Sequence, residues 1–314
     1  MSKNEEYADQ IRLLIRLLPI IDKEDCFALK GGTAINLFYR NMPRLSVDID
    51  LLYLPMGDRE TSLANIRAAL ARITDSVKKT IIGAQVQNTT LQQDNSLRLI
   101  ISLDDVRVKI ELSPVIRGSL FPAVRMEVKP EVEKEFGYAE MLVASHPDLY
   151  AGKLCAALDR QHPRDLFDVK QLYENEGLTE ELRKTFLVFL ISHFRPMAEL
   201  LNPNRKDISG IYETEFLQMA EIEVTLEELL SVRERLISDI NKEMTDSERK
   251  FLLSIKNKTP DWTLSGLDAN LVSELPSVKW RLLNLEKMTK DKHLAAYKSL
   301  EAVLYPIDGV EKVD

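Results

Sequence analysis

Apolar residues near the N-terminus recur with two different spacings, and each spacing predicts a different element. From residue 7 to residue 18 they recur at helical spacing, whereas residues 46–54 alternate apolar with polar positions at their start and are rich in β-formers. We therefore predict a helix over 7–18, a short connection over 19–25 and a strand over 46–54. A further helix is predicted to begin after the glycine pair 31–32 and to end before Pro43.

The middle of the chain predicts one more helix and an antiparallel hairpin. Helical spacing covers residues 62–73. Residues 97–104 and 106–113 read as strands, and the pair Asp104–Asp105 between them is a turn signal. The two segments are therefore predicted to be neighbouring strands.

A pair of helices is predicted next. Ser145 and Asp148 stand three residues apart before an apolar run, which is the spacing of a capping box. Pro163 breaks the helix that follows, and a second helix runs from about residue 164 to residue 173 and ends at Gly177.

Beyond residue 180 the apolar pattern is helical throughout, with no convincing strand. The predicted fold class is thus α/β (α+β): a mixed-sheet domain over residues 1–178, followed by an α-helical domain over 179–314, in a bilobed chain.

Composition and charge narrow the function classes. The net charge of −8 gives no overall attraction to nucleic acid or to an anionic membrane, so any such contact must be local. Residues 211–243 carry nine acidic and three basic side chains, whereas residues 242–298 carry eleven basic and eight acidic ones, so the second stretch is the expected basic surface. Two cysteines fit neither a disulfide framework nor a metal site, and no signal or membrane-spanning run is present. We expect a cytoplasmic protein without a membrane partner.

Two carboxylates stand inside the strand predicted over residues 46–54. Side chains alternate between the two faces of a strand, so Asp48 and Asp50 share one face while Val47 and Ile49 take the other. Positions two apart lie roughly 6.5 Å from each other along a strand, close enough for both carboxylates to reach one cation. Oxygen ligands favour Mg²⁺ or Mn²⁺. Glu111, on the polar face of its own strand, is a candidate third metal ligand.

The glycine pair supplies a complementary feature. Gly31 and Gly32 precede a helix, where backbone N–H groups and the positive helix end favour phosphate oxygens. Taken singly, a glycine pair is most often a turn, a D-x-D strand is most often an exposed edge, and Glu111 is most often a solvated charge. The combination predicts a site for a metal ion and a nucleoside triphosphate (NTP).

Five segments together resemble a known family. They are GGTAINL, RLSVDIDL, KIEL, KLCAALDRQHPRDLFDV and ELPSVKWRLLNL, and they span about residues 29–285. The chain resembles the AbiEii/AbiGii-type nucleotidyltransferase toxins, which include the mycobacterial MenT toxins and belong to the DNA polymerase β-like superfamily. The resemblance implies a nucleotidyltransferase fold, Mg²⁺-dependent transfer of a nucleotide from an NTP, and pairing with a cognate antitoxin.

The resemblance also implies roles for individual residues. In the first two motifs Gly32 and Thr33 would hold phosphate, Ser46 would lie beside the triphosphate, and Asp48 and Asp50 would bind metal.

The remaining residues that match the family's motifs lie in the predicted pair of helices. Lys153 matches the motif lysine, and Asp165 and Asp168 match the R-D-x-x-D ending; we expect all three to be catalytic. Lys153 and Arg160 are seven apart on one helical face. Taken alone, Lys153 is better explained as a side chain that reaches solvent, but beside the D-x-D site a contact to the triphosphate is preferred.

The role of Glu111 stays open, and a structural role is favoured for two histidines and two tryptophans. Glu111 binds metal, activates the acceptor hydroxyl, or does neither. His146 and His162 stand beside prolines at helix boundaries, where a structural role is favoured, and core packing is the default for Trp262 and Trp280.

The leading prediction is a Mg²⁺-dependent enzyme that moves a nucleoside monophosphate (NMP) from an NTP to RNA, specifically the tRNA 3′ end. Such a toxin would block translation until an antitoxin intervenes. The alternatives are transfer to a small molecule or a protein hydroxyl, and a non-catalytic partner-binding module.

Overall fold

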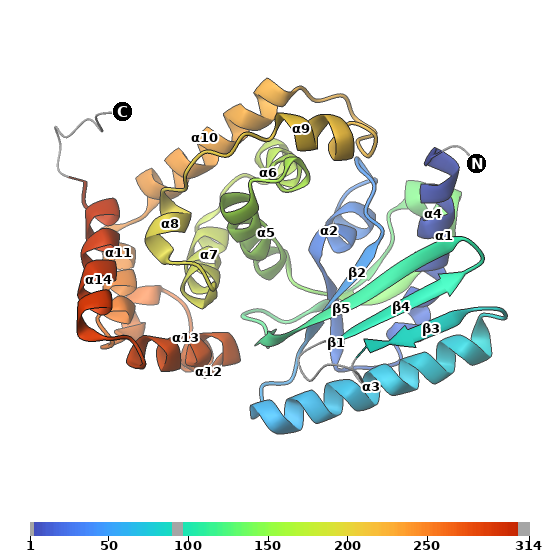
Figure 1. Cartoon of the computed structure of the whole chain (residues 1–314), viewed down its shortest axis with the longest axis horizontal. Coiled ribbons are helices and arrows are strands. Elements are labelled where there is room, and N and C mark those ends of the chain that lie inside the picture. The colour runs from blue at the N-terminus through green and yellow to red at the C-terminus, as the bar shows by residue number, and fades with distance from the viewer. Residues whose placement is uncertain (1–2, 90–96, 307–314) are drawn as a thin grey trace. The chain divides into compact units, whose positions relative to one another are not determined.

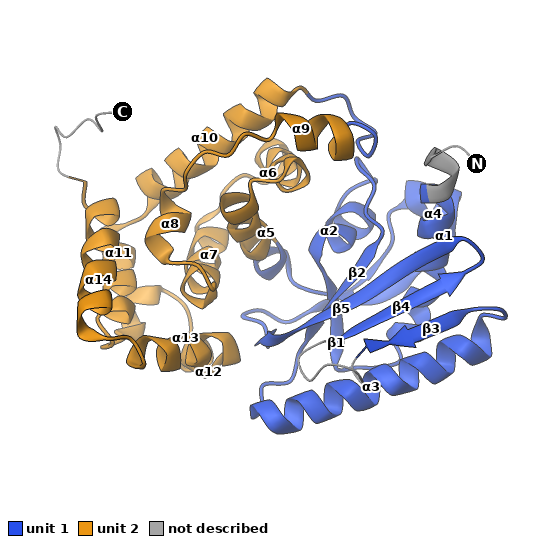
Figure 2. Ribbon diagram, viewed as in Figure 1, with its two compact units in different colours: residues 1–149, 217–224 blue, residues 150–216, 225–314 orange. Residues whose placement is uncertain are grey.

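The computed structural model describes residues 3–89 and 97–306, and the chain divides into two compact units (Figures 1 and 2). Unit 1 comprises residues 1–149 and 217–224, and unit 2 comprises residues 150–216 and 225–314. This division falls at a different place from the boundary after residue 178, because the second helix of the predicted pair packs against a helix of unit 2. The functional boundary at 178/179 stays a prediction.

Unit 1 is built on a mixed sheet. In order along the sheet, its seven described strands are β3 (Gln85–Asn88), β4 (Arg98–Leu103), β5 (Val106–Arg117), β2 (Asp48–Tyr53), β1 (Phe27–Lys30), β7 (Glu140–Val143) and β6 (Val124–Glu127). The pairs β2–β5 and β1–β7 are parallel, and the other neighbours are antiparallel. The mixed sheet expected from the sequence is confirmed.

The helices of unit 1 cover this sheet (Figure 1). They are α1 (Lys3–Ile21), α2 (Gly31–Ala34) with its π-helical continuation η1 (Ile35–Tyr39), α3 (Arg59–Thr80) and α4 (Pro130–Phe136). Helix α1 contacts β5, β7 and α3, whereas α2 packs against β1 and β2. The strand carboxylates are therefore adjacent to a helix start.

Several boundaries differ from the sequence-based prediction. Helix α1 runs through Pro19 to Ile21 because Ile20 and Ile21 are buried, which outweighs the single N–H that proline lacks. Helix α3 is longer than predicted, and four-residue strands such as β1 and β6 were not predicted.

The predicted hairpin is confirmed. Leu103 pairs with Val106 across a two-residue loop, and Asp104 adopts a φ of 52°, which aspartate tolerates in turns.

The described residues of unit 2 form helices and connecting loops and include no strand, as predicted. It takes α5 (His146–Arg160) from Tyr150 onward, and continues with the following helices: α6 (Pro163–Asn175), α7 (Glu180–Ser192), α8 (Met197–Leu201), α9 (Ser209–Ile211), η3 (Tyr212–Phe216), α10 (Leu226–Glu243), α11 (Asp246–Lys256), η4 (Trp262–Ser265), α12 (Ala269–Glu274), α13 (Pro276–Glu286) and α14 (Lys290–Leu304). Helix α6 begins at Pro163, with two residues between it and the end of α5, and Gly177 follows α6 with a φ of 75°.

The capping box predicted at the start of α5 forms only in part. Ser145 Oγ accepts a hydrogen bond from the Asp148 N–H at 3.2 Å. The Asp148 carboxylate, however, accepts from the backbone N–H groups of Leu120 and Phe121, both at 3.0 Å, and so joins a distant loop of unit 1 to the helix start.

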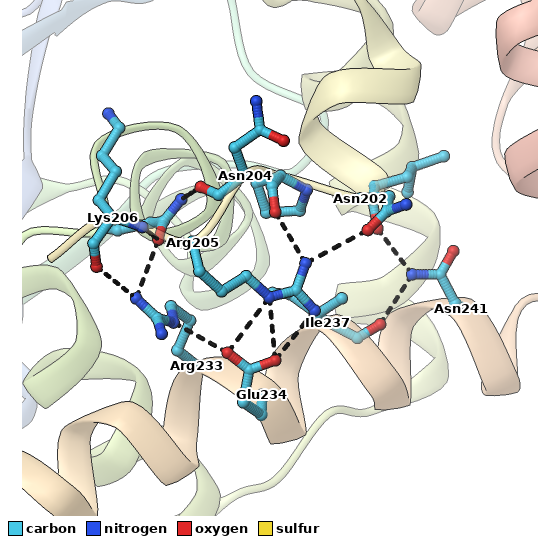
Figure 3. A network of polar contacts seen from close by, with 11 residues as sticks. Asn202, Asn204, Arg205, Lys206, Arg233, Glu234, Ile237 and Asn241 are labelled. Carbon is cyan, nitrogen blue, oxygen red and sulfur yellow. Dashed lines mark hydrogen bonds and ion pairs between the residues drawn. The ribbon is translucent and has the colours of Figure 1, made fainter. Parts of the chain in front are cut away.

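A polar network fixes the irregular segment after α8 against α10 (Figure 3). Arg205 pairs with Glu234 at 2.9 Å, and Arg233 donates to the Lys206 carbonyl at 2.8 Å. The buried Gln161 donates to the Asn204 carbonyl at 2.7 Å and accepts from Arg233 at 3.1 Å. This network satisfies backbone groups that no regular element pairs.

Candidate functional site

Strand β2 places the two carboxylates that the sequence singled out. Ile49 and Leu51 point into the core, whereas Asp48 and Asp50 are half-buried on the other face. Asp50 lies opposite Lys30 of β1 on one side and opposite Glu111 of β5 on the other. The predicted neighbourhood of Asp48, Asp50 and Glu111 is thus present in the strand register.

The first glycine of the pair lies directly against Asp50. Gly31 has a φ of 78°, and a Cβ added there would lie 2.3 Å from Asp50 Oδ2. Gly32 is also closely surrounded, since its Cβ would lie 2.8 Å from Arg44 Nη2 and 2.9 Å from Ser46 Oγ. Position 31, with its positive φ, therefore requires glycine, whereas a side chain at position 32 would require Arg44 and Ser46 to move; the helix start is in contact with the carboxylate strand.

Two hydroxyl groups join the helix start to β2. The Thr33 hydroxyl donates to the Asp48 carbonyl oxygen at 2.5 Å, and its oxygen lies 3.0 Å from Ser46 Oγ. Because the single proton of Thr33 is directed to the carbonyl, the Ser46 hydroxyl is the donor to Thr33. Thr33 is buried and holds the backbone at Asp48.

A segment distant in sequence supports the residues that precede β2. Arg44 forms an isolated antiparallel bridge with Ala220. The Leu45 N–H donates to the Met219 carbonyl at 2.8 Å, and the Glu221 N–H donates to the Pro43 carbonyl at 3.0 Å. Sequence reasoning missed this support because nothing in residues 217–224 has a strand pattern.

A lysine bridges the carboxylates of β2 and β5. Lys109 Nζ lies 3.0 Å from Glu111 Oε2 and 3.6 Å from Asp48 Oδ2, and Arg98 of β4 also pairs with Glu111. Burial raises the pKa of Asp48; the charge of Lys109 acts against this effect, and the charges of Asp50 and Glu111 add to it. Glu111 therefore already has two cationic partners. The role of Lys109 was missed, although its place two residues before Glu111 on the same strand face was visible.

Asp48 and Asp50 are the candidate ligands for a divalent cation. Among the described residues, no group of three or more His, Cys, Asp or Glu side chains is arranged to hold a metal ion. Asp48 and Asp50 nevertheless offer carboxylate oxygens on one face of the strand. The backbone of Gly31, which has no side chain, lies directly against Asp50. Oxygen ligands of this kind fit Mg²⁺.

The lysine and aspartates of α5 and α6 meet within unit 2. Lys153 Nζ lies 2.8 Å from Asp165 Oδ1 and 2.8 Å from Asp168 Oδ2, and only 8% of the lysine side chain is exposed. Arg160, which is largely exposed, lies 2.8 Å from Asp165 Oδ2. The interpretation of Lys153 as a side chain that reaches solvent is therefore wrong, because two buried carboxylates hold its ammonium.

The histidines and tryptophans set aside from the site lie in varied surroundings. His162 Nδ1 accepts the Arg164 N–H at 3.1 Å at the start of α6, which is a structural role. The His146 ring packs edge-on against Tyr39 with centroids 5.5 Å apart, and Trp262 packs against Phe251. Trp280, in contrast, is 45% exposed, so the expectation of core packing is wrong for this residue.

The basic surface expected over residues 242–298 requires a correction. Lys256 is buried, and Arg281 is partly buried. Lys258 pairs with Glu286 at 3.8 Å, and Lys279 pairs with Glu274 at 2.5 Å. These four residues are thus buried or paired, because helix packing separates residues that are close in sequence, whereas Lys242, Lys287, Lys290, Lys292 and Lys298 of the same stretch are exposed.

No helix within residues 3–89 and 97–306 has the length and hydropathy needed to cross a membrane.

The comparisons with known proteins agree with this architecture. The sequence model of a family described as "Nucleotidyl transferase AbiEii toxin, Type IV TA system" matches residues 12–280. Among solved structures, MenT4, a nucleotidyltransferase toxin from Mycobacterium tuberculosis H37Rv, is similar with a TM-score of 0.57 and 13% identity. The similarity covers 96% of this chain and 95% of that chain, and at this identity it concerns the fold. No curated protein matches the sequence.

Replacing Gly31 by alanine should destabilise unit 1 more than replacing Gly177 by alanine destabilises unit 2. Both glycines have a φ near the same value, 78° and 75°, but only the Cβ at position 31 meets another atom, Asp50 Oδ2, within 3 Å. The shared backbone strain costs about 1–2 kcal/mol. Thermal unfolding followed by circular dichroism measures both losses; equal losses would contradict a steric effect of Asp50, and Gly31→Ala combined with Asp50→Ala should regain stability.

Replacing Lys153 by methionine should lower the free energy of unfolding by about 3–5 kcal/mol, because two buried carboxylates lose their cation. The matched control is Arg160→Met, which removes a largely exposed partner of the same Asp165 and should cost at most about 1 kcal/mol. Urea unfolding measures both values. A loss for Lys153→Met no larger than that of the control would show that the buried pair is not a structural element.

Proposed function

Because the chain belongs to the AbiEii family of nucleotidyltransferase toxins of type IV toxin–antitoxin systems, we propose that it transfers an NMP from an NTP to an RNA acceptor. The proposed acceptor is the 3′ end of a tRNA, so that the modification blocks translation in the cytoplasm. Family membership implies a nucleotide substrate and a cognate antitoxin; the RNA acceptor is our inference.

One observation carries the proposal most directly. The carboxylate face of β2 and the start of α2 lie so close that residue 31 has no room for a Cβ beside Asp50. A phosphate group at the backbone of Gly31, Gly32 and Thr33 would therefore be adjacent to a cation held by Asp48 and Asp50. A plain core strand has no reason to combine these features.

We assign Mg²⁺, or Mn²⁺, to Asp48 and Asp50. When bound, the ion would neutralise charge on the phosphate oxygens as the acceptor oxygen bonds to the α-phosphorus and pyrophosphate leaves. Glu111 would have to leave its ion pairs with Lys109 and Arg98 before it could bind the metal ion or act as a base.

The chain's own residues orient the substrate. In the proposal Ser46 lies beside the triphosphate, and its hydroxyl position is set by Thr33, which is itself fixed to the Asp48 carbonyl. Asp165 and Asp168 hold the ammonium of Lys153 in one position. Lys153 would then offset charge on the leaving pyrophosphate, as the family resemblance implies.

The alternative acceptors are a small molecule or a protein hydroxyl, which the same catalytic residues would serve. RNA is favoured because some members of the family that the chain resembles modify the 3′ acceptor end of tRNA. A non-catalytic binding module is disfavoured because Asp48, Asp50 and the close approach of Gly31 would have no purpose in it.

Asp48→Asn and Asp50→Asn should each lower transfer by about 10²-fold or more, since each removes a ligand charge while retaining side-chain size next to Gly31. The assay incubates the pure protein with each α-labelled NTP, Mg²⁺ and total RNA. Glu127→Gln, on the exposed strand β6, is the control and should transfer at the wild-type rate. Wild-type rates for both asparagine variants would remove these residues from the site, and label on protein or small molecules alone would select the alternative acceptors.

Lys109→Met should increase the affinity for Mn²⁺ several-fold, because the ammonium that lies 3.6 Å from Asp48 and 3.0 Å from Glu111 competes with a divalent cation. Lys109→Arg keeps the charge and is the control. Isothermal titration with Mn²⁺ in the absence of NTP measures the affinity independently of activity. Weaker or unchanged Mn²⁺ binding in the methionine variant would show that Lys109 does not occupy the cation position.

A further inference from the structure

Four basic side chains gather where α7 ends in unit 2. His193 and Arg195 directly follow α7, Lys256 is the last residue of α11, and Arg281 lies in α13. Helices α11 and α13 both pack against α7, and Arg281 Nη2 reaches the Arg195 carbonyl oxygen at 3.5 Å. We call His193, Arg195, Lys256 and Arg281 the α7 cluster.

Acidic side chains compensate only part of this charge. Arg195 pairs with Asp159 and approaches Glu199 at 3.6 Å, and His193 Nε2 lies 3.8 Å from the same Asp159. Burial lowers the pKa of His193, and the positive charges of Arg195 and Arg281 act in the same direction against the effect of Asp159. His193 and Arg195 thus share the nearby acids.

The other two members of the cluster lack acidic partners among the described residues. Lys256 is 4% exposed, and no ion pair joins its ammonium to an acidic side chain within residues 3–89 or 97–306; the ammonium is not among the fully buried side-chain atoms that lack a hydrogen-bond partner. Burial lowers its pKa to about 8, and the charge of Arg281 contributes. Arg281 Nε is buried, and no described residue accepts a hydrogen bond from it. Burial of Arg281 Nε without an acceptor is costly, and Lys256 has no acidic partner in the described residues, so these two groups are suited to a bound anion.

Aromatic side chains accompany these cations. Phe194 is 78% exposed and stacks on His193 with ring centroids 4.5 Å apart. Trp280 precedes Arg281 and is 45% exposed. Large exposed rings next to cations are the combination with which proteins bind single-stranded nucleic acid, because bases stack on the rings and phosphates meet the cations.

We propose that the α7 cluster, with Phe194 and Trp280, is a binding site for single-stranded RNA on the helical unit. Arg281 and Lys256 bind one phosphate group, for which the planar guanidinium and the compact ammonium are both suited. Phe194 and Trp280 stack on the adjacent bases. The site deepens the proposed function, on which it rests for the identity of the nucleic acid, because it would hold the acceptor strand.

The test measures the anisotropy of a fluorescently labelled single-stranded RNA oligonucleotide in EDTA and without NTP, so that no transfer occurs. Phe194→Ala and Trp280→Ala should each weaken binding about 5- to 100-fold. Leu283→Ala, which truncates an exposed apolar residue on the same helix as Trp280, is the control and should bind as the wild type does. Unchanged affinity in both aromatic variants would overturn the proposal.

Charge is tested with a second matched pair on α13. Arg281→Gln should weaken binding and reduce the slope of log affinity against log salt by about 0.7, the value for one phosphate contact with a single strand. Lys279→Gln removes a charge already paired with Glu274 and should leave affinity and slope unchanged. Equal effects of the two variants would mean that RNA responds to overall charge, which overturns the site.

Lys256 supplies a test that uses no RNA. If its ammonium binds phosphate, inorganic phosphate should raise the midpoint of thermal unfolding of the wild type but not that of Lys256→Met. Lys258→Met, whose ammonium lies 3.8 Å from Glu286, is the control and should respond to phosphate as the wild type does. A wild-type response to phosphate in Lys256→Met, or no response in the wild type, would remove Lys256 from the phosphate site.

These outcomes are separable from those of the transfer assay. RNA binding that depends on Phe194 and Arg281 in a protein that transfers no nucleotide would retain this site and reject the proposed function. Transfer to RNA by a protein whose α7-cluster variants bind RNA as the wild type does would reject this site alone.

Discussion

The close approach of Gly31 to Asp50 is the constraint on which the rest of the candidate site depends. With 2.3 Å between a virtual Cβ and Asp50 Oδ2, residue 31 must be glycine, and its φ of 78° turns the chain from β1 directly into α2. This change of direction brings Thr33 within hydrogen-bond distance of the Asp48 carbonyl oxygen. Thr33, held in this way, accepts a hydrogen bond from the Ser46 hydroxyl and orients it. One steric requirement thus fixes the backbone on which the proposed metal and phosphate sites are built.

Two lysines neutralise carboxylates in this protein, and their burial separates their roles. In the sheet, Lys109 pairs with Asp48, whose side chain is 48% exposed, so their separation costs little and a divalent cation can replace the ammonium. Lys153 is enclosed by two buried aspartates, and removing it would leave charges that the interior does not solvate. Lys109 is therefore suited to displacement, whereas Lys153 is suited to a fixed position. Loss of transfer in a Lys153 variant is informative only after its folding has been measured.

The sequence predicted those parts of the fold and site that local periodicity encodes. Alternation identified β2, β4 and β5, and the shared faces of Asp48, Asp50 and Glu111 followed from it. Strands β1 and β6 were missed because four residues are too few to show a period, and they form only because neighbouring strands pair with them. The support of residues 43–45 by residues 219–221 joins positions far apart in sequence, which no local pattern encodes. The same limit applies to Lys109: its strand face was predictable, but its ion pairs depend on how β5 lies beside β2.

Counting charges along the sequence did not show which basic side chains stay accessible, for a related reason. Residues 242–298 have three more basic than acidic side chains, yet Lys258 and Lys279 are paired, while Lys256 and Arg281 are withdrawn from the surface. A net charge of −8 gives no long-range attraction to RNA, so the proposed affinity for RNA would have to come from short-range contacts. Buried cations without acidic partners are effective for this purpose, because little water or salt screens them and a phosphate relieves an existing electrostatic cost. Exposed rings such as Phe194 add affinity that salt does not weaken. If the proposed site binds RNA, local desolvation and stacking, rather than overall charge, would allow an acidic toxin to hold a polyanion.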